Sequence, residues 1–109
     1  MTVKELAEKL TLSEICPGGD IEREITGCYI GDLLSLVMSK AKSGDVWITI
    51  QGNINVPAVA SLTDSAMVII AEGMKLDEDA KVRAMQEGIA VYESPKSAFE
   101  LACSVKECL

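Results

Sequence analysis

Four short apolar runs, each followed by a polar turn and a helical stretch, constrain this chain more than any other feature. The runs are Ile25–Ile30, Val46–Ile50, Met67–Ala71 and Ile89–Tyr92. Val46–Ile50 is β-branched or aromatic throughout, and such continuous apolar character is typical of strands buried on both faces of a parallel sheet. The rhythm therefore predicts an α/β fold, a mainly parallel sheet with helices on both faces.

The segments outside these runs carry apolar residues at helical spacing. The predicted helices cover Val3–Leu10, Leu33–Ala41, Val56–Leu62, a stretch from an Asp77 cap to Glu87, and a last helix from Pro95 that is lined by apolar residues between Phe99 and Leu109. Leu12–Cys16 is predicted as a short strand before the first turn. Asp32 and Ser94 are predicted N-caps, with Pro95 as the first helical residue. Right-handed crossovers place helices on both faces only where the strand order reverses, and the sequence leaves the exact strand order open.

Composition bounds the class of protein and its partners. The 109 residues suit a single domain spanning 1–109. The formal net charge of −7, with only two arginines, argues against a nucleic-acid partner, which would need clustered cations. No apolar stretch approaches the roughly 20 residues that span a bilayer, and the charged N-terminal helix does not resemble a secretory signal. We therefore expect a cytoplasmic protein that does not associate with membranes.

The sequence carries no obvious catalytic or metal-binding constellation. It has no histidine and no phosphate-binding P-loop. The four cysteines lack the paired spacing of a zinc site and are expected to be thiols, so no metal and no cofactor is predicted. Cys28 falls inside a predicted strand, where a packed thiol is favoured over a reactive thiolate. Glu72 and Glu93 could pair across neighbouring strands, but two exposed glutamates at the sheet edge are the preferred interpretation.

Polar residues follow three of the predicted strands at their carboxyl ends. In open α/β sheets, ligands bind beyond these ends, where short loops and helix N-termini offer hydrogen bonds. These loops predict a ligand site, although glycine, asparagine and serine also end strands for structural reasons alone. The candidate ligand-binding residues are Gln51, Gly52, Asn53, Glu72, Gly73, Glu93 and Ser94.

Taken in order, several segments resemble the DRTGG domain family, which is related to the N-terminal domain of HPr kinase/phosphorylase. The segments that carry the resemblance are Thr2–Leu10, Ile25–Asp32, Gly44–Thr49, Ala71–Gly73, Gly88–Val91 and Ser94–Glu100. The chain departs from the residues that name the family. The Asp-Arg pair falls near Gly52-Asn53, and the Thr-Gly-Gly segment falls at Ala71–Gly73, so both charges and one glycine are missing.

The resemblance implies a fold like the HPr kinase N-terminal domain and a regulatory or interaction module without kinase activity. We therefore expect a non-enzymatic homodimer that binds a protein partner or senses a small ligand at its strand ends. A nucleotide or small-anion sensor is the alternative. Loss of the arginine weakens the case for an anion, because a bidentate contact is lost with it. A small enzyme that uses Glu72 or Cys28 ranks lowest.

Overall fold

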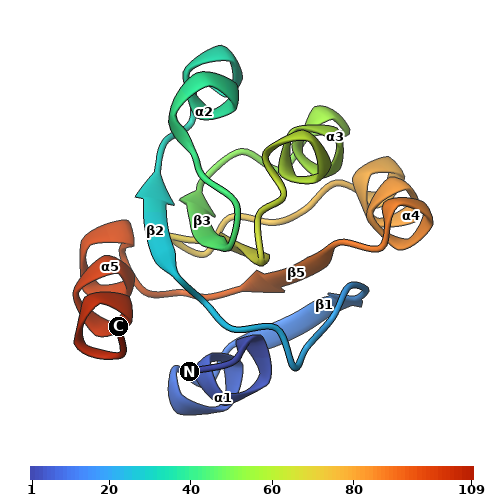
Figure 1. The fold of residues 1–109 in the computed structure, drawn as a ribbon. Helices are drawn as coiled ribbons and strands as arrows, with labels where there is room; N and C mark the ends of the chain where they lie inside the picture. The colour runs from blue at the N-terminus through green and yellow to red at the C-terminus, as the bar shows by residue number, and fades with distance from the viewer.

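The computed structural model describes residues 1–109 as five strands and five helices (Figure 1). None of the helices is long and apolar enough to cross a membrane. In chain order the elements are α1 (Val3–Lys9), β1 (Ser13–Pro17), β2 (Gly27–Ile30), α2 (Leu34–Lys40), β3 (Asp45–Thr49), α3 (Asn55–Thr63), β4 (Met67–Ile70), α4 (Glu78–Glu87), β5 (Ala90–Glu93) and α5 (Ala98–Glu107).

The sheet has the order β1-β5-β4-β3-β2, with β2 to β5 parallel and β1 antiparallel at one edge. The predicted mainly parallel sheet with helices on both faces is confirmed, and the order of the parallel strands does not reverse. Each crossover steps to the next strand in one direction, so the right-handed rule puts α2, α3 and α4 on one face. The other face is covered by α1 and α5, which are not crossovers between parallel strands (Figure 1).

Each face of the sheet has its own aliphatic core. Leu6 of α1 and Leu101 of α5 join alternate strand residues such as Ile48 and Ile69 on one face. Trp47 and the neighbouring strand residues pack against α2, α3 and α4 on the other face. Trp47 is fully buried, and its indole N–H donates to the Gly31 carbonyl at 2.9 Å. Burial of both faces explains why the central strands are apolar at successive positions.

Two helix starts differ from the prediction. The N-cap of α5 is Ser97 rather than Ser94, because Ser97 and Glu100 form a reciprocal capping box. Asp32 does not cap α2, since its carboxylate instead accepts hydrogen bonds from the Thr49 hydroxyl (2.8 Å) and the Ile50 N–H (2.9 Å). That contact fixes the loop after β2 beside the loop after β3.

Leu101 and Phe99 test how much the α1–α5 face contributes to stability. Both lie on α5, but Leu101 is 0% exposed and Phe99 is 76% exposed. We expect Leu101→Ala to lower the free energy of unfolding by about 2–5 kcal/mol through cavity formation. The control Phe99→Ala should change it by about 0.5 kcal/mol or less. Urea unfolding measures both, and equal losses would contradict the assignment of this face as a core.

Candidate functional site

The loops that follow β3, β4 and β5 meet at one edge of the sheet and are joined by backbone hydrogen bonds. The loop after β4 lies between the other two. On one side the Asp77 N–H donates to the Gly52 carbonyl at 2.8 Å. On the other side Gly73 donates to the Ser94 carbonyl at 3.0 Å, and the Glu72 N–H donates to the Lys96 carbonyl at 2.8 Å. The three polar loops therefore lie together at one edge of the sheet, as predicted.

The two glutamates of this edge hold loops and helices in place. Glu93 is only 7% exposed, so its interpretation as an exposed glutamate is wrong. Its carboxylate accepts from the Leu76 N–H at 2.9 Å and from the Lys75 ammonium at 3.3 Å. Glu72 is exposed, and its carboxylate accepts from the Ala98 N–H at 3.0 Å. A carboxylate at this position stabilises the N-terminus of α5.

A small crevice opens where two successive connections leave the sheet in opposite directions. After β4 the chain turns to the α4 face, whereas after β5 it turns to the α5 face (Figure 1). Such a divergence creates a gap beyond the strand ends, which is the usual ligand position in open α/β sheets. The crevice has a volume of about 220 Å³, and it is lined by Ser13, Gly73, Lys75, Glu93, Ser94 and Pro95.

Three of the seven predicted ligand-binding residues line this crevice: Gly73, Glu93 and Ser94. Glu72 contributes to the loop but not to the lining. Gln51, Gly52 and Asn53 lie after β3, on the other side of the loop that follows β4, and Asn53 donates from Nδ2 to the Gln51 carbonyl Oε1 at 3.2 Å. The structure therefore places the candidates along one edge but brings only some of them to one hollow.

Ser13, Lys75 and Pro95 were not predicted as site residues. Ser13 enters because β1 runs antiparallel to β5 and pairs Ser13 with Glu93, which a local pattern does not reveal. Lys75 lies between Gly73, a predicted strand-end residue, and Asp77, a predicted helix cap. Its place in a strand-end loop could have marked it as a site candidate. Pro95 was expected to begin the last helix, but the helix begins three residues later.

The crevice can donate hydrogen bonds but has little free positive charge. Ser13 and Ser94 each carry a hydroxyl, while the Lys75 ammonium is paired with Glu93. The two arginines are engaged elsewhere, Arg23 with Asp64 at 2.9 Å and Arg83 with Glu87 at 3.6 Å. This arrangement suits a small polar group better than a polyanion, because an anion would meet the buried Glu93 carboxylate.

The thiol and carboxylate considered for catalysis are both in environments that oppose it. Burial, with a smaller contribution from Asp45, raises the pKa of Cys28 to about 11. The thiol is therefore protonated near neutral pH, whereas a nucleophile would need the thiolate. Glu72 is held by a helix N-terminus. Neither group is paired with a base or an acid that would activate it.

Comparison with known proteins gives one informative likeness. No protein-family profile matches this sequence, and no curated protein matches it. The fold matches a structure of the CBS and DRTGG domains from the regulatory region of a Clostridium perfringens pyrophosphatase, in complex with its activator, diadenosine tetraphosphate. The TM-score is 0.80 at 12% sequence identity. The fold is DRTGG-like.

The likeness covers 99% of this chain and 47% of the pyrophosphatase chain, so this chain spans about half of that region. It confirms the resemblance to the DRTGG domain at the level of the fold. The ligand-binding role of the residues at the strand-end edge stays a prediction.

Gly52 and Gly73 test whether the contact between neighbouring loops holds this edge together. A Cβ at Gly52 would lie 2.1 Å from the Lys75 carbonyl oxygen, while a Cβ at Gly73 would meet nothing within 4 Å. Gly73 has a φ of +72°, so Gly73→Ala should cost about 1–2 kcal/mol from backbone strain alone. Gly52→Ala should cost about 2–4 kcal/mol, because the clash is with backbone. Thermal or urea unfolding that ranked the two in the opposite order would contradict this contact.

Proposed function

We propose that this chain is a regulatory module that works as a homodimer, with two copies meeting along the free edge of β2. The likeness to a regulatory region supports the regulatory part of the proposal. The observation that carries the dimer is an uncharged, open strand edge bordered by exposed apolar side chains. An edge strand of this kind pairs readily with a second strand, and a two-fold axis allows the same edge to serve both copies.

The edge of β2 is open and has no charged side chain of its own. β2 pairs with β3 on one side only, and the sheet ends there. Its residues are Gly27, Cys28, Tyr29 and Ile30. Natural edge strands are usually protected by charges, proline or a covering element. Since β2 contains no charged residue, a second copy that pairs with this edge would cover its unpaired backbone groups.

Exposed apolar side chains gather at the carboxyl end of the same edge. Ile30 is 46% exposed, Leu33 66% and Ile50 41%. They lie at one corner because the Asp32 carboxylate binds the Ile50 N–H and thereby joins the loop after β2 to the loop after β3. One oxygen of the Asp32 carboxylate is held by its bonds to Thr49 and Ile50, although the residue is exposed. The corner is therefore apolar apart from this one aspartate.

Electrostatics favour this edge over other surfaces for self-association. Each copy carries a net charge of −7, so most surfaces would bring like charges together. Exposed charges interact over about 8–10 Å at ordinary ionic strength, and a contact with few carboxylates reduces that repulsion. Two β2 edges would join eight uncharged residues and two apolar corners, which is the self-complementary arrangement that a two-fold dimer requires.

Ile30→Lys tests this interface against a matched control. The substitution adds a charge at the strand's exposed end, where in an antiparallel two-fold pairing it would lie against the uncharged β2 edge of the second copy. Light scattering with size-exclusion chromatography at about 50 µM should show a dimer for the wild type and a monomer for Ile30→Lys. Leu62→Lys, on α3 at 75% exposure, should remain a dimer. A monomeric wild type, or dissociation by both variants, would contradict the proposal.

A second candidate function is nucleotide sensing, with a hydroxyl-bearing group of the ligand in the crevice between the loops after β4 and β5. The observation that favours it is the position of this crevice where the two connections diverge. Its volume of about 220 Å³ lies below the roughly 300–1,000 Å³ of sites that enclose a drug-sized molecule. It could therefore admit one hydroxylated group of a nucleotide, with the phosphates and the rest of the ligand outside.

Thermal unfolding with nucleotides tests this second candidate. A ligand present at about 100 times its Kd should stabilise the folded protein by about 2.7 kcal/mol. The panel would contain inorganic phosphate, AMP, ATP and diadenosine tetraphosphate. Any stabilisation should be weaker in Ser94→Ala, which removes one hydroxyl from the crevice. No rise in melting temperature across the panel would eliminate this candidate and leave the dimer proposal unaffected.

A further inference from the structure

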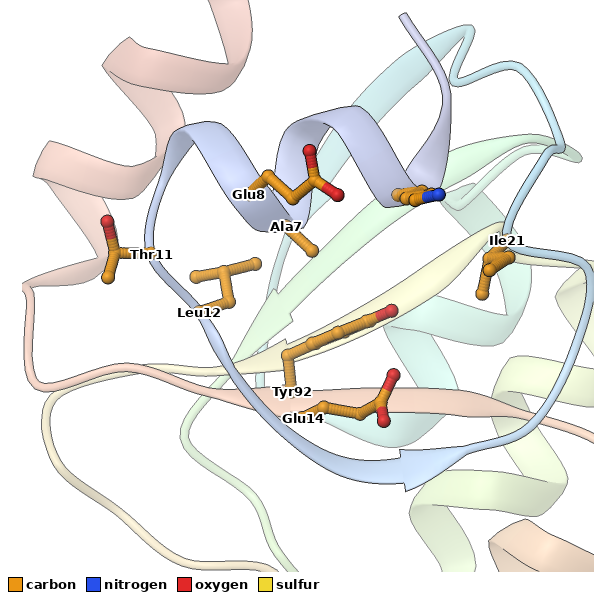
Figure 2. Close-up of a pocket in the computed structure, with 8 residues that line it drawn as sticks. Ala7, Glu8, Thr11, Leu12, Glu14, Ile21 and Tyr92 are labelled. Carbon is orange, nitrogen blue, oxygen red and sulfur yellow. The ribbon is translucent and has the colours of Figure 1, made fainter.

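A larger hollow lies on the α1–α5 face, between α1 and the antiparallel edge of the sheet (Figure 2). Its volume is about 530 Å³, within the range of sites that enclose small organic molecules. α1 forms one wall, the start of β1 forms the other, and Tyr92 of β5 lies between them. We call this hollow the α1–β1 groove. It is at the opposite edge of the sheet from β2.

α1 has two faces, and only one of them belongs to the core. Val3, Leu6 and Leu10 are buried against the sheet. Lys4, Ala7 and Glu8 follow at helical spacing on the adjacent face and line the groove, and Thr11 joins them from the turn after the helix. The start of the helix is fixed, because the Lys4 N–H donates to the Ile21 carbonyl at 2.9 Å. Ile21 itself closes one end of the groove (Figure 2).

Tyr92 is the residue that most clearly indicates a ligand site in this groove. Its side chain is largely enclosed and the residue is only 3% exposed, yet its hydroxyl has no hydrogen bond to any protein atom. Every fully enclosed polar side-chain atom in this protein has a partner, so the unpartnered hydroxyl opens to the groove. Figure 2 shows the ring across the groove, with its hydroxyl toward Ile21 and beside the Glu14 carboxylate. Buried hydroxyls normally find a partner, and here a ligand can supply one.

The charges of the groove select the kind of ligand. Glu14 is the cross-strand partner of Tyr92, so the carboxylate and the hydroxyl lie on the same face of the sheet. Glu8 adds a second carboxylate from α1, against a single ammonium on Lys4. A phosphate or carboxylate ligand would be repelled by the excess negative charge. A cationic nitrogen could donate to Glu14 and to the Tyr92 oxygen together.

Apolar surface supplies the remainder of the recognition. Ala7, Leu12 and Ile21 border the groove, together with the mostly buried Tyr92 side chain. A flat aromatic body would bury its area against these groups while its amine reaches the carboxylates. We propose that the α1–β1 groove binds a small organic cation with an aromatic body, held by Tyr92 and Glu14. This site is independent of the dimer edge and of the crevice after β4 and β5.

Titration of the full chain with tryptamine tests the site directly. The matched probe is indole-3-propionate, which has a similar ring and chain but the opposite charge. We expect tryptamine to shift the backbone amide resonances of Ala7, Leu12, Glu14 and Tyr92, with a Kd of about 10 µM to 1 mM from the affinity per atom of small ligands. Indole-3-propionate should cause no comparable shifts. Equal binding of the two probes, or no binding of tryptamine, would overturn the proposal.

Two variants separate recognition from folding. Tyr92→Phe removes only a hydroxyl that has no protein partner, so the melting temperature should be preserved while the Kd for tryptamine rises about threefold to tenfold. Glu14→Gln should raise the Kd by a similar factor of about three to ten. The control Asp79→Asn removes one charge from an exposed position on α4, on the other face of the sheet, and should leave the Kd unchanged. An unchanged Kd in both groove variants would overturn the assignment.

Discussion

The constant direction of the crossovers is the constraint on which the rest of this structure depends. Because β2, β3, β4 and β5 are neighbours in chain order, right-handed connections put α2, α3 and α4 on one face. The other face must then be covered by the two terminal helices. From this follow the open edge at β2, the divergence of the chain after β4 and β5, and the hollow between α1 and β1.

Many polar groups at the strand-end edge already form hydrogen bonds within the protein and are not free to bind a ligand. Glu93 is buried with two donors, Glu72 holds the start of α5, and Gly52 accepts from the loop after β4. Each of these bonds satisfies a polar group that would otherwise cost free energy when shielded from water. What remains available at this edge is a pair of hydroxyls. The open groups of the molecule are found instead at the β2 edge and at the Tyr92 hydroxyl.

Local pattern was sufficient to predict the strands and most of the helices. Val46, Trp47 and Ile48 are buried although they point to alternate faces, so the apolar character of this strand is continuous and easily recognised. Gly88 ends α4 in the left-handed conformation, as glycine at that position indicates. The cap of α5 was misplaced because Ser94-Pro95 and Ser97 with Glu100 are both plausible starts. Only the contact of Glu72 with Ala98 and the capping box distinguish them.

Features that depend on distant pairing could not be predicted in this way. Strand order is not encoded in the spacing of apolar runs, so the β2 edge was not identifiable. The α1–β1 groove depends on the pairing of Glu14 with Tyr92, two residues that lie at opposite ends of the chain. On α1 itself, Lys4 and Glu8 have the pattern of an ordinary solvated face. The burial of Glu93 likewise arises from the loop after β4, which folds over it.

Hydrogen exchange at the two sheet edges tests the central claim, that the β2 edge is where two copies meet. Amide exchange of residues 27–30 and 13–17 would be compared at about 1 µM and about 100 µM protein, since mass action favours the dimer at the higher concentration. The account predicts added protection at residues 27–30 with concentration, and none at residues 13–17. Exchange that is independent of concentration at β2, or protection that appears at β1 instead, would contradict it.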